Sequence, residues 1–340
     1  MSSVFEHAWL SGLFTDPEMA SLWSAESQMA HMLAVESAWS AALGFPEVGA
    51  KVAVFEPDIG EILEGTAQDG VPVPALVKQL KAAFGADGIH TGLTSQDVVD
   101  TALVLTILET VGLLEARLEK LIEAFDDLNG RFGARPLMGR TRMQAATEIL
   151  VADRLSSWRF PHFNHRARLR DLRPRIGHLQ IGGASGDRAA LGADAFRLLA
   201  EMEAVMGLPA GAKAWHAMRD GVGEFASILS LITGSLGKFG QDIALMAQQG
   251  IDDAKLSGGG GSSAMPHKQN PILAELLVTL ARFNATQIAG VHHALVHEQE
   301  RSGTAWTLEW MILPQMAHAT GRSLSAALSL TSSIESLGKG

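Results

Sequence analysis

One short segment gathers most of the residue types that acid–base chemistry requires. From Ser257 to Pro271 the chain reads SGGGGSSAMPHKQNP, in which hydroxyls, an imidazole, an ammonium and an amide follow four glycines. Glycine and serine alone would be typical of a flexible linker. The residues that follow do not have linker composition, and Pro271 suits the first turn of a helix. The segment therefore indicates a mobile loop that carries a general acid or base toward a substrate.

Two nucleotide-binding interpretations fit this segment poorly. A P-loop places glycine directly before lysine, whereas six residues separate Gly261 from Lys268. The dinucleotide pattern can be laid over Gly259, Gly261 and Ala264, but the preceding QDIALMAQQG has the composition of a helix rather than a strand. The linker and the lid are the interpretations left open.

Composition limits the class of function. The chain has 340 residues, 47% of them hydrophobic, and a formal net charge of -10. This charge argues against a nucleic-acid surface, so any anionic substrate must meet local positive charge. The chain contains no cysteine, which excludes disulfides, thiolate catalysis and Cys-ligated zinc.

The start of the chain, MSSVFEHAWLSGLF, has neither a basic leader nor a signal-cleavage site. Apolar stretches elsewhere are interrupted by charge before they reach the length of a membrane span. We therefore expect a cytoplasmic protein without membrane or nucleic-acid partners.

Long helices must position the reactive loop. Between Thr101 and Leu128 apolar residues recur at spacings of four and three, which predicts one buried helical stripe: Leu114, Leu118, Leu121, Phe125 and Leu128. Similar segments run from about 147 to 173, 223 to 249, 271 to 298 and 307 to 333. The pattern predicts an all-α fold, with a long-helix bundle over residues 101–340 and a smaller N-terminal helical domain over residues 1–100.

The segment GGGGSSAMPHKQNP resembles the signature loop of the fumarase/aspartase superfamily. HTGLTSQDVVDTALVL (90–105) resembles the first motif of that superfamily, GRTRMQAATEI (139–149) its second, and LGKFGQDIALMAQ (236–248) the helix leading to the loop. The similarity covers roughly residues 6–333. Members commonly continue with a further helical domain, so the resemblance implies that the usual C-terminal domain is absent.

The resemblance implies a shared reaction step, in which a bond β to a carboxylate is made or broken through an aci-carboxylate carbanion. No cofactor and no metal are implied. By its place in the loop Ser262 would carry the proton, and Lys268 would stabilise the carbanion. A serine hydroxyl needs strong activation for this role. Ser263, Met265 and Asn270 would bind or orient the substrate.

The first motif offers hydroxyls at a helix start. Thr94 and Ser95 could cradle a carboxylate there, with Asp97 as a cap in the first turn, although ordinary capping uses the same atoms. His90 resembles the histidine that the superfamily carries just upstream, and a purely structural role for it is equally open.

The second motif departs from the pattern of many lyases, which carry Thr-His where this chain has Thr141-Arg142. A carboxylate leaves well as an anion without help from a histidine, because its unperturbed pKa is about 4. Lactonization is such a reaction, and the lactonizing branch of the superfamily also lacks this histidine. Arg142 could bind an extra substrate carboxylate. Thr141 and Gln144 are assigned to substrate binding by their place in the motif.

Two further segments are similar to the lactonizing branch: AWHAMRDGVGEFAS (214–227) and HEQERSGTAWTLEW (297–310). They supply Arg219 and Arg301 as candidate cations for a small tricarboxylate substrate, although each arginine could instead be a surface or ion-pair residue. His216 would either touch the substrate or brace Asp220. A metal site at His293 and His297 is disfavoured, since no carboxylate is placed as in HExxH.

Taken together, the resemblance implies a cycloisomerase that converts 3-carboxy-cis,cis-muconate into 4-carboxymuconolactone. It also implies a homotetramer whose sites are shared between subunits, since the motifs lie at scattered helix ends. The alternatives are an adenylosuccinate lyase-like enzyme that releases fumarate and a catalytically silent structural relative.

Overall fold

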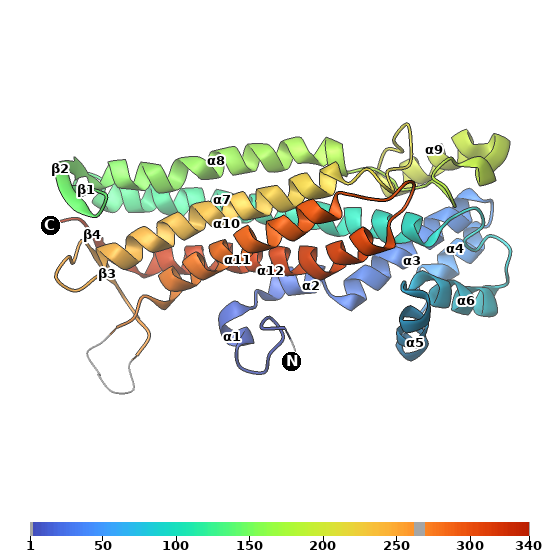
Figure 1. The fold of residues 1–340 in the computed structure, drawn as a ribbon, viewed down its shortest axis with the longest axis horizontal. Helices are drawn as coiled ribbons and strands as arrows, with labels where there is room; N and C mark the ends of the chain where they lie inside the picture. The colour runs from blue at the N-terminus through green and yellow to red at the C-terminus, as the bar shows by residue number, and fades with distance from the viewer. Residues whose placement is uncertain (1–2, 262–268, 340) are drawn as a thin grey trace.

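Long helices run side by side along the length of the molecule (Figure 1). The computed structural model describes residues 3–261 and 269–339. The long helices are α7 (Ser95–Phe132), α8 (Val151–Ile176), α10 (Asp220–Met246), α11 (Ile272–Ala294) and α12 (Gly303–Ser333). Each begins and ends within a few residues of the segment that the sequence predicts, except that α7 extends further at both ends. The prediction of an all-α, fumarase/aspartase-like helix bundle is confirmed.

Shorter helices gather mainly at one end of the bundle, on the right in Figure 1. They are α1 (Ser11–Phe14), α2 (Pro17–Leu22), α3 (Ala25–Ala42), α4 (Pro46–Val52), α5 (Ile59–Asp69), α6 (Val73–Phe84), the 3-10 helix η1 (Ala189–Asp194) and α9 (Ala195–Met206). Of these, α1 and α2 lie along the middle of the bundle instead.

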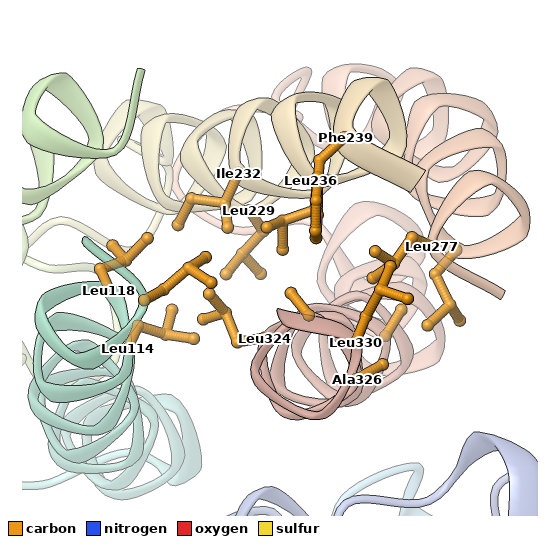
Figure 2. Packing of buried hydrophobic residues seen from close by; sticks show 14 of the residues in the cluster. Leu114, Leu118, Leu229, Ile232, Leu236, Phe239, Leu277, Leu324, Ala326 and Leu330 are labelled. Carbon is orange, nitrogen blue, oxygen red and sulfur yellow. The ribbon is translucent and has the colours of Figure 1, made fainter. Parts of the chain in front are cut away.

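The predicted apolar stripe of α7 forms part of the main core. Its members Leu114, Leu118, Leu121, Phe125 and Leu128 are at most 1% exposed. Figure 2 shows α7, α10 and α12 turning leucine, isoleucine and phenylalanine side chains toward one another. Full burial of such a side chain stabilises the fold by about 1.5–3 kcal/mol relative to exposure. This packing makes the bundle a rigid support for the short helices and small sheets at its two ends.

A second core fills the end that carries the short helices. It joins α3, α6 and α9 to the first turns of α7 through residues such as Trp39, Leu80, Val98 and Met202. The segment that precedes α9 also contributes, through Leu179 and Ile181. The division into domains at residue 100 stays a prediction, and that position falls inside α7.

Two small antiparallel sheets occupy the opposite end of the bundle. One pairs β1 (Pro136–Thr141) with β2 (Gln144–Leu150), and the other pairs β3 (Ala254–Leu256) with β4 (Ile334–Leu337). The predicted helix from about residue 147 was wrong over its first turn, which belongs to β2. The cause is the turn between β1 and β2: Arg142 and Met143 both have positive φ, 49° and 65°, as a tight two-residue hairpin requires.

Helix α11 meets the length and composition of a membrane span, with a mean hydropathy of 1.2 over 18 residues. The expectation that charge interrupts every such stretch was therefore wrong for this helix. α11 packs between α10 and α12, and only 28% of the window is buried. A single helix of this length and composition is weak evidence for a membrane.

Candidate active site

One buried carboxylate organises the N-terminus of α7. Asp97 is fully buried, and its Oδ2 accepts hydrogen bonds from the backbone N–H groups of Thr94 at 3.0 Å and Gly183 at 2.9 Å. Its Oδ1 accepts from the N–H of Gly182 at 2.9 Å and from Nε2 of His216 at 2.8 Å. The predicted capping role of Asp97 is confirmed. The same carboxylate also ties the 182–183 loop and His216 to the start of the helix.

His216 braces Asp97 rather than Asp220. Its side chain is 2% exposed, whereas Asp220 is exposed at the start of α10. Gly182 allows this approach, because a Cβ at that position would lie 2.4 Å from Ala214 Cβ and 2.8 Å from His216 Cε1. The carboxylate of Asp97 can only accept, so Nε2 carries the proton in this hydrogen bond. His216 thus braces a carboxylate as the second alternative predicted, but the carboxylate is that of Asp97 and not that of Asp220.

Arg219 sits in a buried ion cluster. Its guanidinium donates to Asp100 at 2.7 and 3.2 Å and to Glu309 at 2.9 and 2.5 Å, and all three side chains are at most 1% exposed. Burial by itself lowers the pKa of Arg219, but the two carboxylates outweigh it and hold the pKa above its ordinary value. With four hydrogen bonds engaged inside the protein, Arg219 is placed to support the site rather than to meet a substrate.

Asp100 is the hub of this ion cluster. Besides Arg219 it accepts hydrogen bonds from Gln96 at 3.0 Å, Gln180 at 3.2 Å and Trp306 at 3.0 Å. These partners come from α7, from the segment before α9 and from α12. The polar cluster therefore fixes the relative positions of the elements that surround the start of α7.

Arg301 and Thr94 meet at the surface above these buried groups. Arg301 Nη1 donates to Thr94 Oγ1 at 3.0 Å, and Nη2 donates to the carbonyls of Gly183 at 3.3 Å and Ala184 at 3.1 Å. Ser95, the first residue of α7, lies directly beside Thr94. A guanidinium and hydroxyls at a helix N-terminus suit a carboxylate. Within the part of the chain that the structure describes, this grouping is a portion of the predicted site that one chain assembles by itself.

His90 lies close by, with a different buried partner. Its Nδ1 is 2.6 Å from Oε1 of Glu36, whose side chain is fully buried. The His90 side chain is 15% exposed, and its backbone has a positive φ of 56°. Such a conformation is uncommon for residues other than glycine. It lets His90 span between the buried Glu36 and the surface.

The second motif lies at the other end of the molecule. Thr141 and Gln144 flank the turn between β1 and β2, and Arg142 forms the tip of that turn. All three residues are exposed. α7 has 38 residues, so at 1.5 Å per residue it separates this hairpin from Thr94 by about 57 Å. One chain does not bring the two motifs together.

The signature loop also starts from the hairpin end. Asn270 pairs with Gly260 through two backbone hydrogen bonds of 3.0 Å just before α11. Ser262, Ser263, Met265 and Lys268 lie outside the described residues. The predicted catalytic pair is therefore not placed by the structure.

The sequence profile of the Lyase family matches residues 31–290. The chain belongs to this family, within the fumarase/aspartase superfamily. It is 36% identical to the 3-carboxy-cis,cis-muconate cycloisomerase of Pseudomonas aeruginosa over 296 residues, which is 85% of this chain and 64% of that relative. It is 30% identical to an N-acetyl-S-(2-succino)cysteine lyase of Enterococcus italicus, over 93% of this chain and 72% of that enzyme.

The fold comparison points to the same group. The crystal structure of the 3-carboxy-cis,cis-muconate lactonizing enzyme from Pseudomonas putida superposes with a TM-score of 0.91 at 32% identity. The match covers 97% of this chain and 77% of that one. The chain therefore belongs to the lyase family by sequence and by fold, and it spans less than two thirds of the length of the Pseudomonas aeruginosa relative.

Several residues that shape the site had not been predicted. Glu36, Asp100, Gln180 and Glu309 are buried polar side chains, each bonded to another member of the site. A weak signal was available for Asp100, since a second aspartate one turn after Asp97 interrupts an otherwise apolar helical face. Glu309 lies within the 297–310 segment that resembles the lactonizing branch, whereas Glu36 and Gln180 lie outside the motifs and are identified only by their partners.

Proposed function

We propose that this chain is a 3-carboxy-cis,cis-muconate cycloisomerase of the cytoplasm that forms 4-carboxymuconolactone. The observation that carries the proposal is its similarity to enzymes of that name, at 36% identity in sequence and a TM-score of 0.91 in fold. The Thr141-Arg142 pair supports it, because lactonization expels no amine and needs no histidine at that position.

In the proposed reaction one substrate carboxylate adds to a carbon–carbon double bond of the same molecule. A new C–O bond forms at the β carbon, and the π electrons move onto the neighbouring carboxylate as an aci-carboxylate. Lys268 stabilises that charge and Asn270 orients the group. Ser262 then delivers a proton to the α carbon. Nothing leaves, so substrate and product have the same mass.

Arg301 and Thr94 would bind a second carboxylate of the substrate. Their contact of 3.0 Å holds the guanidinium beside the start of α7. Ser95 and His90 lie next to this surface. The buried side chains of Asp97, His216 and Arg219 lie beneath it and fix the elements that carry it. Arg142, on its exposed turn, would bind a third carboxylate, with Thr141 and Gln144 beside it. A tricarboxylate would thus meet positive charge at each of its ends.

A complete site would require several chains. The surface of Arg301 and Thr94 lies at one end of the bundle, while the hairpin of Arg142 and the base of the signature loop lie at the other. We infer a homotetramer in which antiparallel neighbours bring opposite ends together. The 18-residue apolar window of α11, of which only 28% is buried within one chain, supports a helix that packs against other subunits.

A succinyl-cysteine lyase is the second candidate, favoured by the 30% identity to the Enterococcus italicus enzyme. A substrate panel separates the possibilities. The purified protein is incubated with 3-carboxy-cis,cis-muconate, with N-acetyl-S-(2-succino)cysteine and with adenylosuccinate, and the products are analysed by mass. Loss of diene absorbance with the first substrate only supports the cycloisomerase. Fumarate from either of the others would overturn the proposal, and no turnover of any substrate would favour a silent relative.

A further inference from the structure

A buried glutamate of α3, Glu36, faces the loop that leads into α7. Its side chain is 0% exposed, and its Oε1 lies 2.6 Å from Nδ1 of His90. Among residues 3–261 and 269–339 its other oxygen, Oε2, has no hydrogen-bond partner. Burial of a carboxylate with so few partners costs the fold free energy. The proposed reaction gives Glu36 no role, so this cost points to a function of the pair.

Three side chains on one face of α3 bond to this loop. Glu36, Trp39 and Ser40 are spaced by three and four positions, which places them on the same side of the helix. Trp39 Nε1 donates to the carbonyl of Thr91 at 2.9 Å, and Ser40 Oγ donates to the carbonyl of Gly88 at 2.8 Å. These two bonds hold the backbone of the loop, whereas the bond of Glu36 reaches the imidazole. The specific effect of Glu36 is therefore on the ring.

The loop packs beside the surface that contains Arg301. The N–H of Leu93 donates to the carbonyl of His90 at 3.3 Å, and this turn leads directly into α7. A Cβ on Gly183 would lie 3.0 Å from the carbonyl oxygen of Gly92, so the two loops touch. The carbonyl of Gly183 in turn accepts a hydrogen bond from Arg301 at 3.3 Å. The imidazole, 15% exposed, thus lies next to the place where a substrate carboxylate would bind.

The bond to Glu36 decides which nitrogen of His90 is left for a ligand. A carboxylate can only accept, so Nδ1 carries the proton in this bond, in a neutral and in a charged imidazole alike. Nε2 makes no hydrogen bond to a described residue, and it is not among the buried atoms that lack a partner. Nε2 is therefore the nitrogen at the surface.

We propose that Glu36 is a positioning residue, which holds the Nδ1 proton of His90 and thereby presents Nε2 to the substrate beside Arg301 and Thr94. The proton on one nitrogen of a histidine is set by the hydrogen bond that this nitrogen makes. Without Glu36 the proton is shared between the two nitrogens and the ring turns more freely. The contact of Nε2 with substrate rests on the proposed function, whereas the hold of Glu36 on the ring does not.

The hold on the ring is tested by NMR of the imidazole nitrogens in the full chain, with isotope-labelled histidine at about pH 8.5, where an ordinary imidazole is neutral. The His90→Gln variant identifies the signals of His90. The wild type should carry a proton on Nδ1, and Glu36→Leu should shift part of it to Nε2. Glu36→Gln, which keeps the volume, is the second variant. A wild-type Nδ1 without a proton, or an unchanged ring signal in both variants, would overturn the inference whatever the substrate.

The role in binding is tested by KM for 3-carboxy-cis,cis-muconate. Glu36→Leu and His90→Gln should each raise KM about tenfold with kcat little changed. The double variant should be no worse than His90→Gln alone, because Glu36 acts through the ring. Effects that multiply in the double variant would refute the positioning role.

Glu109→Gln is the matched control. Glu109 lies 3.3 Å from Nε2 of His31 in another glutamate–histidine pair between α7 and α3. It is about 22 Å further along α7 than Thr94, at 1.5 Å per residue. Its KM should equal that of the wild type. A rise in KM as large as that of Glu36→Leu would show that loss of any such pair disturbs binding, and would count against a specific role of Glu36.

Discussion

Arg301 donates a hydrogen bond to the hydroxyl of Thr94 at 3.0 Å across 207 residues of sequence. The contact joins the segment before α12 to the first turn of α7. Beneath it, Asp97 and the Asp100–Arg219–Glu309 cluster fix the same elements through buried charge. The surface that would bind a substrate carboxylate therefore rests on a buried polar scaffold rather than on loops alone.

Replacing Arg301 tests its proposed carboxylate contact. Arg301→Ala should raise KM by one to two orders of magnitude, as expected for loss of a charge-assisted hydrogen bond. Arg301→Lys should recover only part of the binding, since lysine lacks the planar fork. Steady-state kinetics measure both, with Arg170→Ala on the exposed face of α8 as the control. An unchanged KM for Arg301→Ala would remove this residue from the binding site.

Asp97→Asn should destabilise the protein although it is isosteric. An amide in place of the carboxylate offers N–H groups to neighbours that themselves donate, among them His216 and Gly182. We expect a loss of about 2–4 kcal/mol in the free energy of unfolding, measured with urea. Asp171→Asn, at an exposed aspartate on α8, should cost little. Equal stability of the two variants would argue against the scaffold.

A pair of buried histidines in α8 predicts loss of stability in acid. Burial lowers the pKa of His162 to about 3, with the charge of His165 adding to the effect, and burial lowers the pKa of His165 to about 4. Below about pH 6.5 the unfolded chain binds protons that the folded protein does not bind. Stability should therefore be full above pH 6.5 and fall as the pH drops toward 4, by up to about 1.4 kcal/mol per pH unit for each histidine.

His162→Phe isolates one of these two contributions. His162 stacks on Phe125 with ring centroids 5.9 Å apart, so a second phenylalanine can fill the place. At pH 4.5 the variant should lose about 2 kcal/mol less stability relative to neutral pH than the wild type does. Thermal unfolding followed from pH 4.5 to pH 8 measures this. Parallel curves for the two proteins would show that His162 does not titrate on unfolding.

Sharing of sites between subunits can be tested by complementation. Ser262→Ala changes the signature loop, whose described base at Gly260 and Asn270 lies at one end of the bundle, whereas Arg301→Ala changes the other end. Each variant alone should lose most turnover, by about 10²–10⁴-fold for the proton carrier. Mixing the two after reversible dissociation should restore activity, because some sites then contain neither defect. Light scattering should show particles of four chains of 36.1 kDa each. An active monomer would contradict the shared site.

The sequence was a good guide wherever local pattern decides the structure. The stripe from Leu114 to Leu128 predicted the buried face of α7, and Asp97 three residues after Thr94 predicted its cap. The hairpin around Arg142 was missed, because its turn depends on positive φ at two residues that are not glycine. The local sequence RTRMQ contains none of the residues that usually indicate positive φ in a turn.

The buried polar residues beneath the site could not be predicted from the local sequence pattern. The sequence left Arg219 open between substrate binding and an ion pair, because its charge is apparent but its partners Asp100 and Glu309 lie 119 and 90 residues away. Whether an arginine faces solvent or a buried carboxylate is decided by tertiary packing. The same reason explains why Asp220, a neighbour of His216 in sequence, was the alternative partner to a substrate, whereas the structure pairs His216 with Asp97.

The most direct test of the central claim is the reaction of 3-carboxy-cis,cis-muconate in deuterium oxide, with the product analysed by mass after transfer to water. Cycloisomerization with a proton delivered to the α carbon predicts a lactone of the substrate's composition that retains one deuterium on carbon. Ser262→Ala should slow its formation by at least about a hundredfold. An untouched substrate, or a product without carbon-bound deuterium, would contradict the account.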